Sequence, residues 1–269
     1  VAWAKVNGTG KLTLSGTNNI TGVITISAGT MQIGNGGTTG SLGGSAGIVN
    51  NAALVVNRSD DLAMDNAISG TGTLTKTGAG ALTLGSASTY SGATNVNNGT
   101  LLVNNTTGSG TGSGTVNVAS GATLGGTGAL SGAVTVTGKI APGAVGIESL
   151  GTGAVTWKGA STAGVATDWE FQLGAGNSAD KLDITGNFTK DTTVGSVFNF
   201  DFLGSSFMGI FTLAQWTGTT NFVASDFSYT NLGAASGTFT INGLTKELQF
   251  TAVPEPTGAL AGVLLGAGM

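Results

Sequence analysis

The chain repeats itself, because the stretch that begins at Gly8 recurs from Gly78, and this internal repeat restricts its fold more than any other feature. The stretch GTGKLTLSGTNNITGVITISAGTMQIGN aligns without a gap with GAGALTLGSASTYSGATNVNNGTLLVNN. The alignment superimposes leucines and glycines: Leu12 on Leu82, Leu14 on Leu84, and Gly22 on Gly92. Such a repeat favours a fold made by stacking similar units along one direction.

Within each repeat, apolar residues alternate with small polar residues in units such as LTL, ITI, VNV and VTV. A period of two is typical of a β-strand with one buried face, and the intervening Gly, Asn and Ser favour bends. We therefore predict a chain that winds into stacked coils of roughly 20 to 25 residues, about six or seven of them over residues 1–153. Asn and Thr at the bends would bond like to like between coils.

This prediction places Leu12, Leu14, Leu82 and Leu84 in one shared parallel ladder, and the scaffold interpretation given below is made to depend on that ladder. The alternative is an open antiparallel sandwich, because short alternating strands also occur in that architecture. The pairing direction of the strands separates the two.

Two segments of this region resemble a known family. Residues 70–103 resemble the autotransporter-associated β-strand repeat of bacterial surface proteins, and residues 124–146 are similar to the segment that commonly follows it. The resemblance covers about residues 8–153. It implies an all-β fold, a right-handed parallel β-helix, on an exported protein.

Aromatic residues divide the chain in two. Residues 1–150 contain only Trp3 and Tyr90, whereas residues 151–269 contain all 11 Phe. We predict a β-rich cap over residues 154–252, since bulky rings need a wider core than Val, Leu and Ile. Period-two spacing in DWEFQLG and FNFDFLG favours buried rings over an exposed sugar-stacking surface. TFTINGLTKELQF reads as a hairpin with a two-residue turn at Asn242-Gly243.

Composition excludes several classes of site. The chain has no His and no Cys, so it cannot build a Cys/His zinc centre or a catalytic triad with a His base. Only 8% of its residues are charged and its net charge is −4, without the basic patch that nucleic acid requires. Loose glycine patterns lack the lysine of a phosphate loop. We therefore expect no catalytic residues, no metal, no cofactor and no nucleic acid partner.

The 13 acidic residues could still form a site if they converged. A β-helical polysaccharide lyase or hydrolase would bring Asp60, Asp168, Glu170 and Asp183 into one cleft. Residues 1–57 and 66–147 contain no acid, so a groove along the rod has no carboxylates to use. We interpret the group from Asp60 to Asp65 as a solvated loop. Asp180 and Asp183 fit turn residues better than a calcium site.

The end of the chain, residues 253–269, has a separate character. Pro254 and Pro256 hold Glu255 in an extended pose, because each proline fixes its own φ and biases the residue before it. An uncharged stretch follows whose apolar side chains would lie in lipid as a helix: Leu260, Val263, Leu264 and Leu265. This stretch, residues 257–269, is shorter than the roughly 20 residues that span a bilayer.

This segment resembles the PEP-CTERM sorting signal of Gram-negative bacteria, with its box at Val253, Pro254, Glu255 and Pro256. The resemblance implies processing by exosortase, a membrane protease-transpeptidase, and a transient membrane contact through the apolar segment. The terminal basic cluster of that signal is missing, so we expect the natural chain to continue beyond Met269. A proline turn before a last core element is the alternative.

Together these observations predict an exported structural protein of the bacterial cell envelope or extracellular matrix, and not an enzyme. Its rod would serve as a surface scaffold that contacts exopolysaccharide or other envelope components. A polysaccharide-binding or adhesin module is the alternative, and a β-helical lyase or hydrolase is the third hypothesis.

Overall fold

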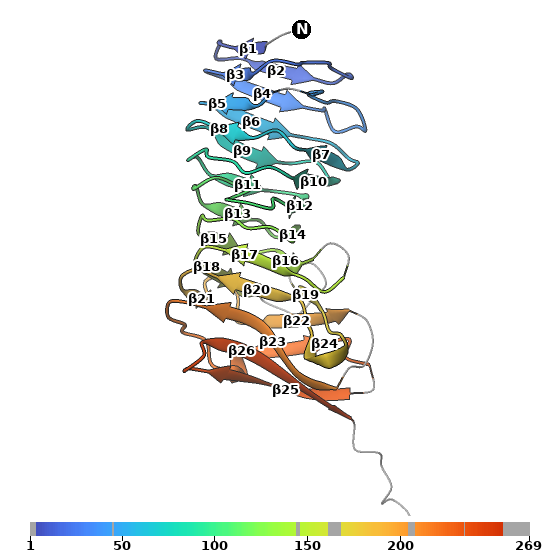
Figure 1. Ribbon diagram of the computed structural model, residues 1–269, viewed down its shortest axis with the longest axis vertical. Coiled ribbons are helices and arrows are strands. Elements are labelled where there is room, and N and C mark those ends of the chain that lie inside the picture. Colours follow the sequence, from blue (N-terminus) through green and yellow to red (C-terminus); the bar gives the residue numbers. More distant parts are fainter. Residues whose placement is uncertain are drawn as a thin grey trace, which may run out of the picture.

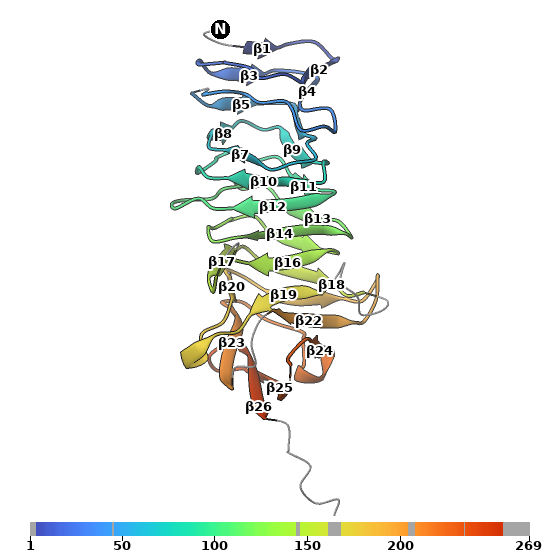
Figure 2. The same ribbon diagram turned by 90° about the vertical axis from the view of Figure 1, so that its right-hand side faces the viewer.

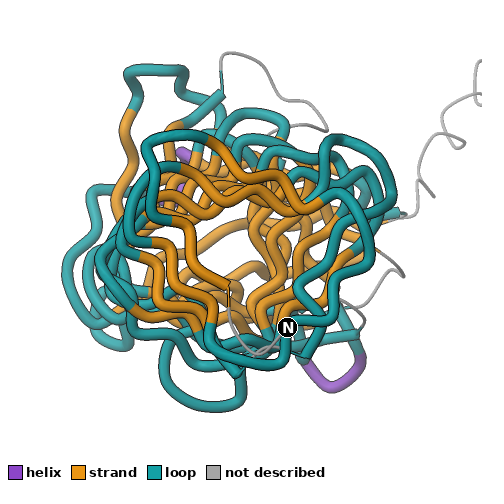
Figure 3. The backbone as a smooth tube through the Cα atoms, turned by 90° about the horizontal axis from the view of Figure 1, so that it is seen from above, coloured by secondary structure: helices purple, strands orange, loops and turns teal. Residues whose placement is uncertain are grey.

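The structure, a computed structural model, describes residues 4–44, 46–143, 146–160, 168–203, 208–233 and 235–254. Within them the chain forms a rod of stacked β-strands, with the N-terminal coils at one end and the aromatic-rich half at the other (Figure 1). The described residues also contain two short 3-10 helices, η1 (Ala175–Asn177) and η2 (Ala224–Asp226). Viewed along the rod, strands surround a common interior (Figure 3).

One parallel sheet of nine strands runs along the rod, and it is called the long sheet below. Its strands, in spatial order, are β2 (Lys11–Leu14), β4 (Thr30–Ile33), β6 (Ala53–Val56), β9 (Thr73–Lys76), β11 (Thr94–Val96), β13 (Val116–Val118), β15 (Val134–Val136), β18 (Val155–Lys158) and β21 (Phe188–Asp191). Every neighbouring pair is parallel. This pairing confirms the stacked coil and excludes the antiparallel sandwich.

A second face begins with a four-stranded parallel sheet: β1 (Ala4–Val6), β3 (Ile24–Ile26), β5 (Ile48–Asn50) and β8 (Ile68–Ser69). Toward the C-terminal end lies the end sheet, in the order β17 (Ser149–Thr152), β20 (Lys181–Ile184), β23 (Gly209–Trp216), β26 (Glu247–Pro254) and β25 (Ala235–Asn242). Backbone hydrogen bonds of bend segments, such as Ser113 N to Tyr90 O and Leu130 N to Gly151 O, connect the two sheets.

The third face carries two more parallel sheets (Figure 2). The first consists of β7 (Leu62–Met64), β10 (Ala81–Leu84), β12 (Gly99–Val103), β14 (Ala122–Gly126) and β16 (Lys139–Pro142). The second consists of β19 (Trp169–Gln172), β22 (Phe198–Leu203) and β24 (Phe227–Thr230). The rod therefore has three faces, and each coil of the chain passes round them in turn.

The coils become larger in the C-terminal part of the rod. The size of a coil is given by the number of residues between paired positions on neighbouring strands of the long sheet. Up to β15 this number is smallest from Val116 to Val134 and largest from Met31 to Leu54. The step from β18 to β21, which joins Val155 to Phe188, is clearly longer than any of these. The part up to β15 is called the narrow half below, and the part from β18 onward is called the wide half. The larger coils enclose an aromatic core, where the rings of Trp157 and Trp169 stack with centroids 3.7 Å apart.

The aromatic residues of the second half form this core, as their period-two spacing predicts. Trp169 and Phe171 are fully buried on one face of β19, and Phe198, Phe200 and Phe202 are at most 2% exposed on β22. The alternating polar residues of β22 are also buried, at 2% for Asn199 and 6% for Asp201, because Asp168, Thr230 and Asn231 bond them.

The prediction that the four repeat leucines share one ladder is wrong, so a scaffold interpretation has to rest on the parallel pairing of the long sheet and not on that ladder. Leu12 and Leu14 lie on β2 of the long sheet, whereas Leu82 and Leu84 lie on β10 of the third face. Three coils carry the chain from Leu12 to Leu74, and the short segment from there to Leu82 carries it round to the next face. The repeat therefore recurs after three coils and about a third of another.

The spacing inside each repeat is nevertheless preserved. Leu12 pairs with Met31 and Leu82 pairs with Leu101, so the step between paired strands has the same length in both repeats. Burial is not preserved, because Leu12 lies on the outermost strand of its sheet and is 42% exposed, while Leu82 is fully buried. The repeated sequence therefore specifies the length of one coil, but it does not specify which face of the rod its strands occupy.

Hydrogen bonds between like side chains join neighbouring strands at two places in the described residues. Asn117 Nδ2 donates to Asn95 Oδ1 at 2.9 Å between β13 and β11, and the hydroxyls of Thr156 and Thr189 lie 3.2 Å apart. At the bends, asparagine side chains bond the backbone of the next coil instead, as Asn104 does with Thr127 N. At bends such as this one, the predicted like-to-like bonding is wrong.

The predicted hairpin is present, with a longer turn. β25 and β26 are antiparallel, and Phe239 lies opposite Phe250. The turn spans residues 243–246 instead of Asn242-Gly243 alone, because Asn242 Oδ1 accepts bonds from Leu244 N and Thr245 N and Lys246 has a positive φ of 57°. The division at residue 153 stays a prediction, although the long sheet crosses it between β15 and β18.

Candidate functional site

The four carboxylates that a hydrolase would need lie apart. Asp60 pairs with Arg58 in a bend, Asp168 accepts a bond from Asn199, and Glu170 forms an ion pair with Lys139 on β16. Asp183 lies on β20 with Lys181 Nζ 3.0 Å away. Within the described part of the chain, each of the four carboxylates has a different bonding partner. The grooves described here contain at most one of the four.

The acidic bend near Arg58 has a structural role. The Arg58 guanidinium donates to both carboxylate oxygens of Asp60 and to the carbonyls of Thr38 and Gly40 in the preceding coil. The Arg58 side chain beside Asp60 holds the pKa of that carboxyl below its usual value. Asp61 accepts a bond from Ala81 N in the next coil. These contacts connect three successive coils.

Asp180 is the carboxyl with the most unusual environment, and sequence analysis assigned it only a turn. It is 1% exposed, and burial raises its pKa to about 6. Its two oxygens accept backbone N–H bonds, Oδ1 from Glu148 at 3.0 Å and Oδ2 from Gln172 at 2.8 Å. Through these two bonds Asp180 connects the segment before β17 to β19.

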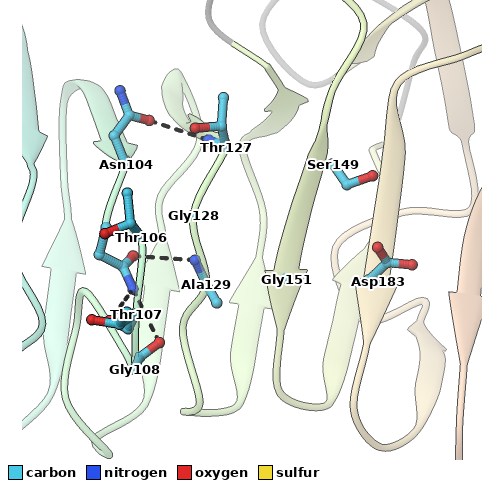
Figure 4. Close-up of a pocket in the computed structure, with 11 residues that line it drawn as sticks. Asn104, Thr106, Thr107, Gly108, Thr127, Gly128, Ala129, Ser149, Gly151 and Asp183 are labelled. Atoms are coloured by element: carbon cyan, nitrogen blue, oxygen red, sulfur yellow. Dashed lines mark hydrogen bonds between the residues drawn. The ribbon is translucent and has the colours of Figure 1, made fainter.

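An open polar groove on the outer wall is a candidate site, and it is called the asparagine groove below. It has a volume of about 510 Å³ and crosses four successive coils (Figure 4). Its lining consists of Asn104, Asn105, Thr106, Thr107, Gly108, Thr127, Gly128, Ala129, Ser149, Gly151 and Asp183. Apart from Asp183, these residues are uncharged and small or hydrogen-bonding.

Asn105 shapes one wall of this groove. The residue is 4% exposed; its Nδ2 donates to the carbonyls of Thr107 and Gly108, and its Oδ1 accepts from Ala129 N at 3.1 Å. Asn104 Oδ1 accepts from Thr127 N in the same coil-to-coil manner. The loop of residues 104–108 therefore lies in a defined position across the groove from Ser149 and Asp183 (Figure 4).

Sequence analysis did not single out this groove. The available signal was the pair Asn104-Asn105 at the end of the second repeat, where Asn105 aligns with Asn35 of the first. The asparagine groove presents hydroxyl and amide groups, which bind polar uncharged ligands. It contains no aromatic ring on which a sugar could stack.

The predicted sorting box lies only partly within the described residues. β26 continues through Val253 and Pro254, which pair with Ser236 and Ala235 of β25, and Val253 is 46% exposed. The box therefore begins inside the last strand. Its other residues, Glu255 and Pro256, and the predicted membrane residues Leu260, Val263, Leu264 and Leu265, lie outside the described residues.

The described part of the chain lacks two features, a cluster of metal-ligating side chains and a membrane-spanning helix. Its acidic residues nowhere form a group of three or more that could hold a metal ion. None of its helices is long and apolar enough to cross a membrane.

Comparison with known proteins connects the first half to bacterial surface proteins. A repeat family described as passenger-associated-transport-repeat matches residues 6–33 and 74–103, which contain the pairs β2–β4 and β10–β12. A protein named adhesin BmaC autotransporter, from Brucella suis biovar 1 (strain 1330), is 64% identical over 56 residues. That alignment covers 21% of this chain and 2% of the relative. These matches confirm the similarity to autotransporter-associated repeats.

Proposed function

We propose that this chain belongs to an exported structural protein of a Gram-negative-type bacterium, in which the β-helical rod is an adhesin-like scaffold at the cell surface. The observation that carries the proposal is the long sheet, whose nine strands are paired in parallel without interruption. With strands about 4.8 Å apart, this sheet spans about 40 Å. The matched repeat family and the adhesin relative support the same interpretation.

Rigidity is the property that such a scaffold contributes. Each coil is bonded to both neighbours by backbone ladders, so bending the rod requires breaking several hydrogen bonds at once. The hydrophobic interior consists mostly of Val, Leu, Ile and aromatic side chains. The carboxylates that a lyase or hydrolase would use are separated, which supports a non-enzymatic role.

Exposure on intact cells tests the surface proposal. An epitope inserted in the turn after Asn242, where Leu244 is 97% exposed, should react with antibody on unlysed cells. External protease should remove the epitope while a cytoplasmic marker stays intact. Reaction only after lysis would overturn the proposal.

Sorting through the C-terminal box is a further part of the proposal. An exosortase-type enzyme would accept the extended box at Val253–Pro256 and process the chain during export, while the apolar residues 257–269 contact the membrane. We expect Glu255→Gln in the natural full-length protein to accumulate unprocessed. The matched control is Glu247→Gln, an acid-to-amide change on the same segment, and equal processing of both variants would contradict the assignment.

The asparagine groove supports a second candidate function, binding of a neutral polysaccharide from the envelope or matrix. Its uncharged amide and hydroxyl lining suits sugar hydroxyls. The test is a pull-down with the insoluble exopolysaccharide of the producing strain. Thr127→Trp would fill the groove and reduce retention, whereas Thr135→Trp on the long sheet would not. Equal retention would remove this candidate.

A further inference from the structure

Asparagine followed by glycine occurs at four places in the chain, and one of these pairs has a distinctive geometry. The four pairs are Asn7-Gly8, Asn35-Gly36, Asn98-Gly99 and Asn242-Gly243. Such a pair can react with itself, because the backbone nitrogen after the asparagine can attack the side-chain amide carbon and glycine has no side chain to obstruct it. How fast this happens depends on how the folded chain holds the two groups.

In the pair Asn98-Gly99 the two reacting groups lie against each other. Gly99 N donates a hydrogen bond to Asn98 Oδ1 at 2.9 Å, so the amide carbon that carries this oxygen lies beside the nitrogen. Asn98 is exposed at the bend before β12, where water reaches it. Groups that are held in contact in this way react faster than groups that must first find each other.

Lys76 contacts the same peptide group from inside the rod. This lysine of β9 is 1% exposed, and its Nζ donates to the carbonyl oxygen of Asn98 at 3.3 Å and to that of Gly78. The attacking nitrogen must lose its proton, and the resulting negative charge spreads by resonance onto the Asn98 oxygen of the same peptide group. An ammonium group already placed at that oxygen stabilises the charge as it develops.

Two of the other pairs are held differently. Gly36 N donates to Asn57 O of the next coil at 2.8 Å, so a neighbouring coil occupies this nitrogen. Asn242 Oδ1 accepts bonds from Leu244 N and Thr245 N, which hold its side chain over the turn. Neither pair has the contact between side-chain oxygen and following nitrogen that distinguishes Asn98.

The bend before β12 requires its glycine but not its asparagine. The first repeat has Ala28 at the position that aligns with Asn98, and the glycines that follow have the same conformation, with φ at 71° for Gly29 and 68° for Gly99. A Cβ on Gly99 would lie within 3.0 Å of three backbone carbonyl oxygens. The fold therefore fixes the glycine and leaves the residue before it open to substitution.

We propose that Asn98 is a self-modification site, which loses its amide to attack by Gly99 N and becomes aspartate or isoaspartate. The bond from Gly99 N to Asn98 Cγ forms, the bond from Cγ to Nδ2 breaks, and ammonia leaves with the proton of the attacking nitrogen. A cyclic succinimide remains, and water then opens it. Cleavage of the new bond at Cγ gives aspartate, and cleavage of the original peptide bond gives isoaspartate.

The modification changes a part of the rod that has no acidic side chain, because residues 66–147 contain neither Asp nor Glu. Each product adds one carboxylate at this bend. Isoaspartate also adds a methylene group to the backbone at the start of β12, where Gly99 pairs with Ala122 of β14. The modified chain therefore differs from the original in charge and, for isoaspartate, in the path of its backbone.

The chain contains a matched control for this reaction, because Asn7 and Asn98 both stand in the sequence Asn-Gly-Thr and both are exposed. The full-length chain is incubated at neutral pH, and peptide mapping by mass spectrometry follows the loss of the amide at both positions. In the folded chain we expect Asn98 to react about fivefold faster than Asn7 or more, and in concentrated urea the two rates should become equal. A folded chain in which Asn98 reacts no faster than Asn7 overturns the proposal.

A second experiment tests the contribution of Lys76. Lys76→Met removes the ammonium group and keeps an unbranched side chain, so the reaction at Asn98 should slow about tenfold, as for the loss of one charged hydrogen bond, while the rate at Asn7 stays the same. Asn98→Ala, which introduces the residue of the first repeat, gives the background of isoaspartate labelling. An unchanged rate at Asn98 in a Lys76→Met variant that circular dichroism shows to be folded overturns the proposal. If that variant does not fold, the comparison of Asn98 with Asn7 in the folded and urea-treated native chain decides.

Discussion

At the scale of single residues, a column of glycines marks one corner of the rod. Each lies just before a strand of the long sheet: Gly72, Gly92, Gly114, Gly132 and Gly153. None has a positive φ, so conformational freedom is not the reason for glycine here. A Cβ on any of them would come within 3.0 Å of a backbone carbonyl of the preceding coil. The column lets successive coils approach closely.

We expect Gly114→Ala to lower the free energy of unfolding by about 1–3 kcal/mol, the usual cost of inserting a methyl group into a packed region. The backbone carbonyl of Gly92, against which the methyl would lie, cannot move without disturbing its own coil. Urea denaturation measures the change. Gly16→Ala is the control, because no atom lies within 4 Å of its added Cβ, and an equal loss in both variants would contradict the close-approach argument.

Asp180 makes stability depend on pH in an unusual direction. Burial raises its folded pKa to about 6, from 3.8 in the unfolded chain. A raised pKa means that the folded state binds the proton more tightly, so this stabilising contribution is complete below pH 3.8 and is lost as the pH rises through about 6. Asp60 and Asp191, whose pKa values are lowered, act in the opposite direction.

The contribution of Asp180 to stability is therefore measured by comparing the native chain with variants at different pH values. Relative to Asp180→Asn, the native chain should gain melting temperature between pH 7.5 and pH 5.0, because only the native residue takes up a proton. Asp183→Asn, at a half-exposed position of β20, serves as the control and should follow the native chain. A native chain and an Asp180→Asn variant with parallel pH profiles would show that Asp180 is not buried in this way.

At the scale of elements, bend asparagines fix the loops that line the asparagine groove. Asn105→Ala would remove three hydrogen bonds and leave the N–H of Ala129 without its acceptor. We expect a loss of about 1–3 kcal/mol in unfolding free energy, as for an unsatisfied buried group. Hydrogen exchange should also accelerate at Ala129. Asn97→Ala, at an exposed position between β11 and β12, should change neither quantity.

The sequence predicts elements well where one physical rule decides them. Alternation in units such as LTL and VTV predicts short strands with a buried face, and the spacing in TFTINGLTKELQF predicts the closing hairpin. It does not predict which face a strand occupies. That depends on the length of each coil, which varies from coil to coil in the narrow half, so Leu12 and Leu82 lie on different faces.

The candidate site was less predictable than the fold, for a related reason. Asn104, Ser149 and Asp183 line one groove only because the stacking of four successive coils brings them together. Their distance along the chain depends on coil lengths that no local pattern specifies. The burial of Asp180 likewise depends on where Glu148 and Gln172 come to lie, so a single residue in a turn-like motif gives no sign of its raised pKa.

At the scale of the whole molecule, two coil sizes share one continuous sheet. β15 of the narrow half pairs with β18 of the wide half, so the backbone ladder passes from one to the other. Their cores differ, with aliphatic side chains in the first and a cluster of stacked and edge-on rings in the second. In stacked-coil proteins each unit contacts only its neighbours, so parts of different stability can unfold separately.

Denaturation followed by two probes should therefore give two curves. In a Trp3→Phe background, all tryptophans belong to residues 154–252, so their fluorescence reports the wide half alone. Far-UV circular dichroism reports both halves. Because aromatic rings bury more surface per residue, we expect the dichroism signal to begin falling at lower urea than the fluorescence signal. Gly114→Ala should shift the early dichroism loss and leave the fluorescence midpoint unchanged. Coincident curves that Gly114→Ala shifts together would mean that the ladder from β15 to β18 couples the rod into one cooperative unit, and the predicted division at residue 153 would then have no thermodynamic meaning.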